Sequence, residues 1–146
     1  MYKRQVYDHP FQWGSKRTGP DLAREGTARL RKSNLWHYSH MIDPRSTSDK
    51  SIMPPYPWLA EDALDVSSLE DKIGAMRTLG VPYPAGYEDR ALADLQAQAD
   101  EIASDIEVIG GFEVARDKEI LALIAYLQRL GTDIEVPEVA ENTNNE

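Results

Sequence analysis

The sequence predicts a mainly α-helical domain whose first part consists largely of loops. No segment alternates polar and apolar residues with the period of two that marks a half-buried strand. Residues 6–58 contain nine prolines and glycines, which leave room only for short helices between turns. From residue 59 onward, apolar residues recur at spacings of three and four in three separate stretches. With 146 residues, of which 41% are hydrophobic, the chain suits one modest core.

The clearest helix of the loop-rich part is predicted over residues 34–41. Ser33 is available as its N-cap. Asp43 ends it, because a residue that precedes proline is pushed out of the α region.

The next predicted helix begins at residue 67 and ends before Gly80 and Pro82. Ser67 and Glu70 have the spacing of a capping box, in which each side chain bonds a backbone N–H of the first turn. Its expected apolar stripe consists of Leu69, Ile73, Met76 and Leu79.

Two longer amphipathic helices are predicted after it. One spans about 88–106 and carries its apolar stripe at Leu92, Leu95, Ala99, Ile102 and Ile106. The other begins near Asp117, ends at Gly131 and carries Ile120, Leu123, Ile124, Leu127 and Leu130. Residues 132–146 lose this periodicity and are expected to form a disordered acidic tail.

Composition argues against several classes of function. The net charge of −9 disfavours binding to the phosphate backbone of nucleic acid. The chain has no cysteine, so it offers no thiolate ligand and no thioether bond to a haem. Its longest apolar run, residues 120–127, falls well short of the roughly 18 residues of a membrane span. The start of the chain lacks the apolar stretch of a secretory signal.

Charge is divided unevenly along the chain. Residues 1–58 hold ten Lys and Arg against five Asp and Glu, whereas residues 59–146 hold six against twenty. The acidic half either marks a surface for a partner or is a solvated helical face with a polar tail.

Two groups of side chains could carry chemistry. His37 and His40 are three residues apart on a predicted helix and could face one metal ion, or they could have surface or packing roles. Met53 begins a segment with three prolines in its next four positions. Such prolines hold an extended chain and present the thioether in one orientation, as an axial haem ligand requires. A methionine simply buried in a proline-rich loop is the alternative.

Five short motifs follow one another between residues 6 and 134. They are residues 9–22, which end in Gly19-Pro20-Asp21-Leu22, then Asp43-Pro44-Arg45, then 53–59, then 79–83, then 124–131. The Gly-Pro-x-Leu turn resembles the one that follows the haem-binding segment in class I cytochromes c. All five motifs together resemble the mono-haem subunit II of cbb3-type cytochrome c oxidases.

This resemblance implies a class I cytochrome c-like domain over residues 6–131, with a helical insertion at about 60–110. It makes Met53 the distal axial ligand, and the Pro20 carbonyl would orient a proximal histidine. Trp13 and Arg17 would lie near the haem edge and bond its propionates. The apolar wall around the haem would consist of Leu22, Trp36, Tyr56 and Trp58. Each aromatic residue could instead belong to an ordinary core, and Arg17 could be a surface charge.

The resemblance also implies two segments that the sequence lacks. In the family, a transmembrane helix and a C-x-x-C-H haem-attachment sequence precede the stretch matched here. Residues 1–5 look like a translated sequencing adaptor, so we expect a truncated chain whose native sequence begins near Val6. Without these segments, the chain itself is not expected to bind haem c.

The implied function is electron transfer without bond chemistry. In the intact protein, one haem c would relay electrons to the oxygen-reducing catalytic subunit, with c-type cytochrome subunits as further partners. The missing helix would anchor the domain on the periplasmic side of the bacterial inner membrane. The alternative is a haem-free helical module in which the acidic helices dock onto a partner.

Overall fold

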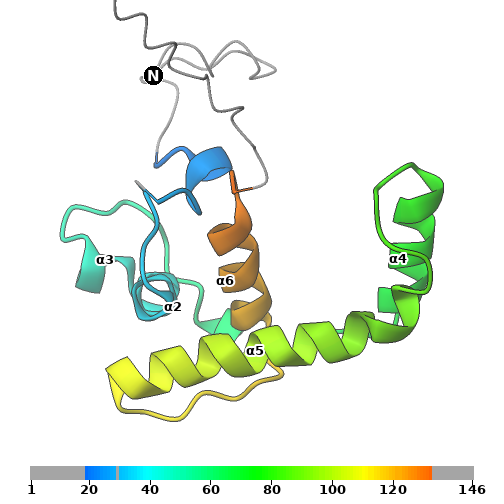
Figure 1. The fold of residues 1–146 in the computed structure, drawn as a ribbon. Coiled ribbons are helices and arrows are strands. Elements are labelled where there is room, and N and C mark those ends of the chain that lie inside the picture. Colours follow the sequence, from blue (N-terminus) through cyan, green and yellow to red (C-terminus); the bar gives the residue numbers. More distant parts are fainter. Residues whose placement is uncertain (1–18, 29, 133–146) are drawn as a thin grey trace, which may run out of the picture.

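The computed structural model describes residues 19–28 and 30–132, and these are helical (Figure 1). Its α-helices are α2 (Asn34–Ile42), α3 (Pro44–Thr47), α4 (Leu69–Thr78), α5 (Glu88–Gly110) and α6 (Glu119–Arg129), with 3-10 helices η2 (Leu22–Arg24) and η3 (Pro57–Ala60). Within the described residues the only β pairing is an isolated bridge between Ala63 and Lys118. The prediction of a mainly α domain is therefore confirmed.

The core lies where α6 crosses the middle of α5, with α2 packed beside both helices (Figure 1). Its buried side chains come mainly from α5 and α6, and they are Ala99, Ile102, Ala103, Ile106, Val114, Ile120, Leu121 and Ile124. One face of α2 covers this cluster with Leu35, Tyr38, Met41 and Ile42, and η3 adds Leu59 and Ala60. The predicted stripes of the last two helices thus meet each other from Ala99 onward, whereas Leu92 of the α5 stripe lies outside this core and is 42% exposed.

Helix α2 begins and ends where the sequence predicts. The Ser33 hydroxyl accepts a hydrogen bond from the Trp36 backbone N–H at 3.1 Å, which satisfies one free donor of the first turn. Asp43 has an extended backbone and ends the helix before Pro44. Its carboxylate then accepts from the Arg45 N–H at 3.1 Å and caps α3.

The predicted capping box at Ser67 is wrong. Helix α4 begins at Leu69, and its N-cap residue Ser68 makes no side-chain capping bond. The Ser67 N–H instead donates to the Asp65 carboxylate at 2.9 Å, so a local turn uses the group that the box requires.

The ends of the last two helices also differ by a few residues from their predicted positions. Helix α5 continues to Gly110, beyond the predicted end at Ile106, and stops where Gly111 adopts φ +72°. Helix α6 begins at Glu119 rather than near Asp117 and ends before Gly131, which has φ +80°.

Helix α4 and the N-terminal half of α5 project from the body as an arm (Figure 1). Ile73 of the predicted α4 stripe is buried, but Met76 is 44% exposed and Leu79 is 80% exposed. The predicted apolar stripe of this helix is therefore buried only in part. The reason is geometric, since α4 packs chiefly on α5 at the end that lies away from α2 and α6.

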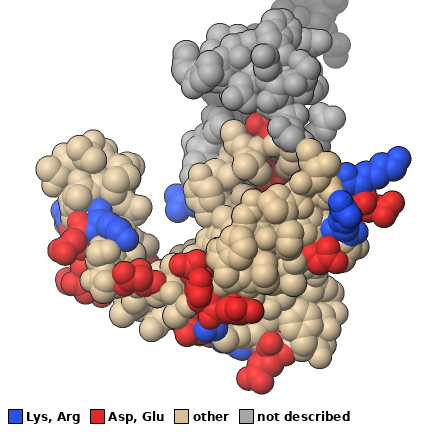
Figure 2. All heavy atoms as spheres, turned by 180° about the vertical axis from the view of Figure 1, so that it is seen from behind, with Lys and Arg blue, Asp and Glu red and all other residues tan. Residues whose placement is uncertain are grey.

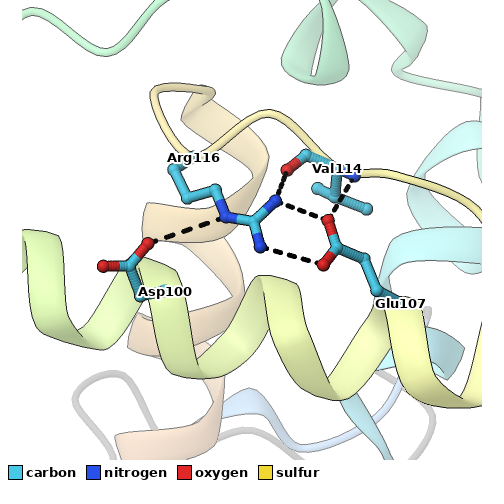
Figure 3. Close-up of polar contacts among 4 residues, drawn as sticks. All are labelled: Asp100, Glu107, Val114 and Arg116. Atoms are coloured by element: carbon cyan, nitrogen blue, oxygen red, sulfur yellow. Dashed lines mark hydrogen bonds and ion pairs between the residues drawn. The ribbon is translucent and has the colours of Figure 1, made fainter.

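A polar clamp holds the loop that leads from α5 to α6 (Figure 3). The Glu107 carboxylate accepts from both terminal nitrogens of Arg116, at 2.5 and 2.9 Å, and from the Val114 N–H at 2.9 Å. Arg116 also donates to the Val114 carbonyl at 2.7 Å and pairs with Asp100 at 3.6 Å. The fork of the guanidinium thereby fixes Val114, a core residue, against α5.

The loop before α2 lies directly on the C-terminal end of α6. The Gly26 N–H donates to the Leu130 carbonyl at 2.9 Å. A Cβ atom on Gly26 would stand 2.6 Å from the Gln128 carbonyl carbon and 2.9 Å from the Leu130 carbonyl oxygen. Only glycine permits this approach, because the obstacle is backbone and cannot rotate away.

Replacing Gly26 with alanine should therefore destabilise the domain. We expect Gly26→Ala to lower the free energy of unfolding by about 1–3 kcal/mol, the usual cost of overpacking. Gly74→Ala is the matched control, since nothing lies within 4 Å of its Cβ position and Gly74 is inside α4. It should raise stability by about 0.5–1 kcal/mol. Urea unfolding followed by circular dichroism measures both, and equal effects would contradict the close contact.

The clamp predicts a dependence of stability on pH. Hydrogen bonds from Arg116 and from the Val114 N–H lower the pKa of Glu107 below its ordinary value of 4.5. The stabilisation is therefore complete above that pH and is lost as the pH falls through the lower, folded-state pKa. Glu107→Gln should flatten the acid limb of stability against pH, whereas Glu101→Gln, on the same helix but outside the clamp, should leave it unchanged. Identical acid limbs in all three proteins would contradict this role.

Candidate functional site

The Gly-Pro turn lies at the surface next to α6. Pro20 is exposed, and Leu22, the first residue of η2, is 54% exposed. The turn continues into Glu25, whose side chain is buried, and into the Gly26 contact with α6. Burial raises the pKa of Glu25, and the charge of Lys32 partly offsets this rise. Trp13 and Arg17 lie outside the described residues.

The Met53 loop is tied to α2 by a backbone hydrogen bond and to α3 by a side-chain hydrogen bond. The Tyr56 N–H donates to the Met41 carbonyl at 2.7 Å, and Arg45 Nε donates to the Ser51 carbonyl at 3.4 Å. The Met53 N–H donates to the Ser51 hydroxyl at 3.2 Å. Met53 itself is half-buried. The prolines and these bonds together fix the backbone on both sides of the thioether.

Two of the predicted wall residues meet beside this loop. The rings of Tyr56 and Trp58 lie 5.2 Å apart at 72°, an edge-to-face contact. Tyr56 is half-buried, and Trp58, in η3, is 47% exposed. Trp58 and Leu22 thus place large apolar surfaces where solvent reaches them.

The fourth wall residue, Trp36, belongs to a cluster of rings on α2. His40 stacks on Trp36 with centroids 4.4 Å apart, and His37 meets its edge at 5.4 Å. The Lys32 ammonium lies 5.6 Å from the Trp36 ring centroid. His40 Nδ1 is bonded to the Thr47 hydroxyl at 2.5 Å. The Trp36 ring therefore contacts two imidazole rings and lies near one ammonium group.

His37 is the unusual member of this cluster, because only 2% of it is exposed and its Nε2 has no hydrogen-bond partner. Burial lowers the pKa of His37, and the nearby charges of His40 and Lys32 lower it further. Burial also lowers the pKa of His40. Within the described residues, no three His, Cys, Asp or Glu side chains come together as metal ligands. Both imidazoles have packing contacts, the alternative that the sequence left open.

Some features of the site could not be read from the spacing of residues. The Gln128 side-chain nitrogen Nε2 donates to the Lys32 carbonyl, in the loop before α2, at 2.8 Å. It also donates to Asn34 Oδ1 at 2.9 Å. Asn34 in turn donates to Asp105 of α5 at 3.0 Å. The sequence offered one sign of these bonds, the polar amide of Gln128 beside the aliphatic residues near the end of the last helix.

The described residues fit one side of a haem. A neutral thioether on a fixed loop, with aromatic rings beside it, is a suitable soft ligand for haem iron. The second axial ligand and the two thioether attachments need a C-x-x-C-H sequence, and the chain contains no cysteine. Met53 and its loop therefore have the donor chemistry that the distal half of the predicted site requires.

Comparison with known protein families supports the resemblance drawn from the five motifs. The family model described as "Cytochrome C oxidase, mono-heme subunit/FixO" matches residues 2–134. Among curated proteins, no match is found. In the described part of the chain, no helix combines the length and apolar character needed to cross a membrane.

The burial of His37 predicts a second pH dependence, at higher pH than that of Glu107. The folded-state pKa of His37 lies below its ordinary value of 6.5, so the unfolded chain binds a proton first as the pH falls. Stability should therefore decrease as the pH drops below about 6.5. His37→Leu, which removes the unpartnered nitrogen, should be at least as stable and should flatten the profile between about pH 5 and 7. Urea unfolding at several pH values measures this, and an unaltered profile would contradict it.

Proposed function

The chain belongs to the FixO family, the mono-haem subunits of cytochrome c oxidase, and we propose that it relays electrons in a cbb3-type oxidase. Electrons would pass through one haem c to the oxygen-reducing subunit. The observation that carries the proposal is the Met53 loop, whose thioether is presented on a backbone fixed by prolines and by the Tyr56–Met41 bond.

In this function the residues of the chain hold and tune the cofactor. The haem, when bound, supplies the one-electron redox couple. Met53 would donate its sulfur as a ligand, and thioether ligation raises the potential of haem iron. Tyr56 and Trp58, whose rings touch, would shield that side from water, which would also favour the reduced iron. The Pro20 carbonyl would accept the N–H of the proximal histidine and fix the orientation of its ring.

The remainder of the site comes from the intact subunit. Its C-x-x-C-H sequence would supply the proximal histidine and both attachment sites, and a transmembrane helix would hold the domain at the periplasmic face of the inner membrane. Trp13 and Arg17 would bond the propionates, while Leu22 and Trp36 would complete the apolar wall. The partners would be the catalytic subunit and the c-type cytochrome subunit of the complex.

The ligand assignment predicts a change in redox potential. In the subunit that carries its haem-attachment sequence, Met53→Leu should lower the midpoint potential, within the roughly 0.8 V range that axial ligands span. It should also alter the absorption spectrum of the oxidised haem, because the iron loses its sulfur ligand. Potentiometric titration followed by optical spectroscopy measures both effects.

Met76→Leu is the matched control, because Met76 is a partly exposed methionine of the arm. It should leave potential and spectrum unchanged. A Met53→Leu protein with the potential and spectrum of the parent would refute the assignment.

A further inference from the structure

The arm of α4 and the N-terminal half of α5 has little core of its own. Its buried hydrophobic side chains are Ile73 and Ala91. Helix α4 spans only 10 residues, and isolated helices of that length are marginal in water. The arm nevertheless stands away from the body, with an open notch between them in the space-filling view (Figure 2).

The tip of the arm is uncharged and apolar. Residues 78–87 contain no Asp, Glu, Lys or Arg, and Figure 2 shows the end of the arm free of charged side chains. Leu79 is 80% exposed there, and Met76 and Leu92 nearby on the arm are 44% and 42% exposed. These three residues belong to the apolar stripes that the sequence predicts, and each leaves two-fifths or more of its surface exposed.

The tip is also held in one shape before any partner binds. Gly80 turns the chain with φ +92°, and the Val81 N–H donates to the Met76 carbonyl at 3.0 Å. The rings of Tyr83 and Tyr87 stack 5.2 Å apart at 10°. An ion pair between Arg77 and Glu88 joins α4 to the start of α5. A preformed surface of this kind loses little conformational entropy on binding.

The helices of the arm carry a net negative charge. Residues 69–98 hold five Asp and Glu against three Lys and Arg. Two of these three cations are already paired, Arg77 with Glu88 and Arg90 with Asp94. An apolar centre with a charged rim is the usual anatomy of a protein interface, and the sign of this rim suits a basic partner surface. Anionic lipid, in contrast, would be repelled.

We propose that this arm docks its apolar tip onto a neighbouring oxidase subunit, at an apolar patch surrounded by Lys and Arg. The proposal rests on the proposed function, because it takes the partner from the oxidase complex. Helix α5 runs from the arm into the core, where Ala103 and Ile106 are fully buried. Docking at the tip would therefore fix the orientation of the whole domain on its partner.

Site-specific crosslinking in the assembled oxidase tests the proposal. A photoreactive phenylalanine analogue is placed at position 79 and, as a control, at Val108, which is 85% exposed near the opposite end of α5. We expect position 79 to crosslink to another oxidase subunit with a yield several-fold above that of position 108. Asp71→Lys combined with Asp89→Lys should reduce the yield at position 79, because both are exposed acids of the arm.

The outcomes separate this proposal from the proposed function. If the tagged chain purifies with the oxidase but position 79 gives no crosslink, or gives no more than position 108, the docking surface is wrong and the function stands. If the subunit that carries this chain together with its haem-attachment sequence does not purify with the oxidase at all, both are wrong. Binding of the chain to vesicles of phosphatidylcholine and phosphatidylglycerol, abolished by Leu79→Asp, would assign the tip to lipid and overturn the proposal.

Discussion

The close contact between Gly26 and the end of α6 is the constraint on which the rest of the arrangement depends. It brings a loop of the first part of the chain onto the last helix, at a distance that only a residue without a side chain allows. Next to this contact, the Gln128 side-chain amide donates to the Lys32 carbonyl and to Asn34 Oδ1. Asn34 then reaches Asp105 of α5. One point thus joins α2 to α5 and α6, which come more than 40 residues later in the sequence.

These contacts hold two of the separated motifs in fixed positions relative to each other. The Gly-Pro turn is held through Gly26 to α6, and the Met53 loop is held through Tyr56 to α2. Because α2 and α6 pack on each other and share the Gln128–Asn34 bond, the two segments cannot move independently. A rigid arrangement of this kind would suit the haem site that we propose, because a bound cofactor needs its contacting residues in fixed positions.

Features set by neighbouring residues could be predicted from the sequence, and features set by distant ones could not. Ser33 and Pro44 act within a few residues of α2, so its limits followed directly. Periodicity showed that Leu79 lies on an apolar stripe, but it cannot say whether another element covers that stripe. The burial of His37 likewise depends on tertiary packing. Met53 and its fixed loop could be predicted because the prolines are local signals, whereas the Tyr56–Met41 tie could not.

Helix α5 joins the core to the arm. Its C-terminal half belongs to the core on which α2 and α6 pack, and its N-terminal half belongs to the arm. A continuous helix transmits a rigid orientation over its 23 residues, since each turn is bonded to the next. Electron transfer between subunits requires a fixed approach of one cofactor to another. An arm built on the same helix as the core can provide that fixed approach without adding any residue to the haem pocket itself.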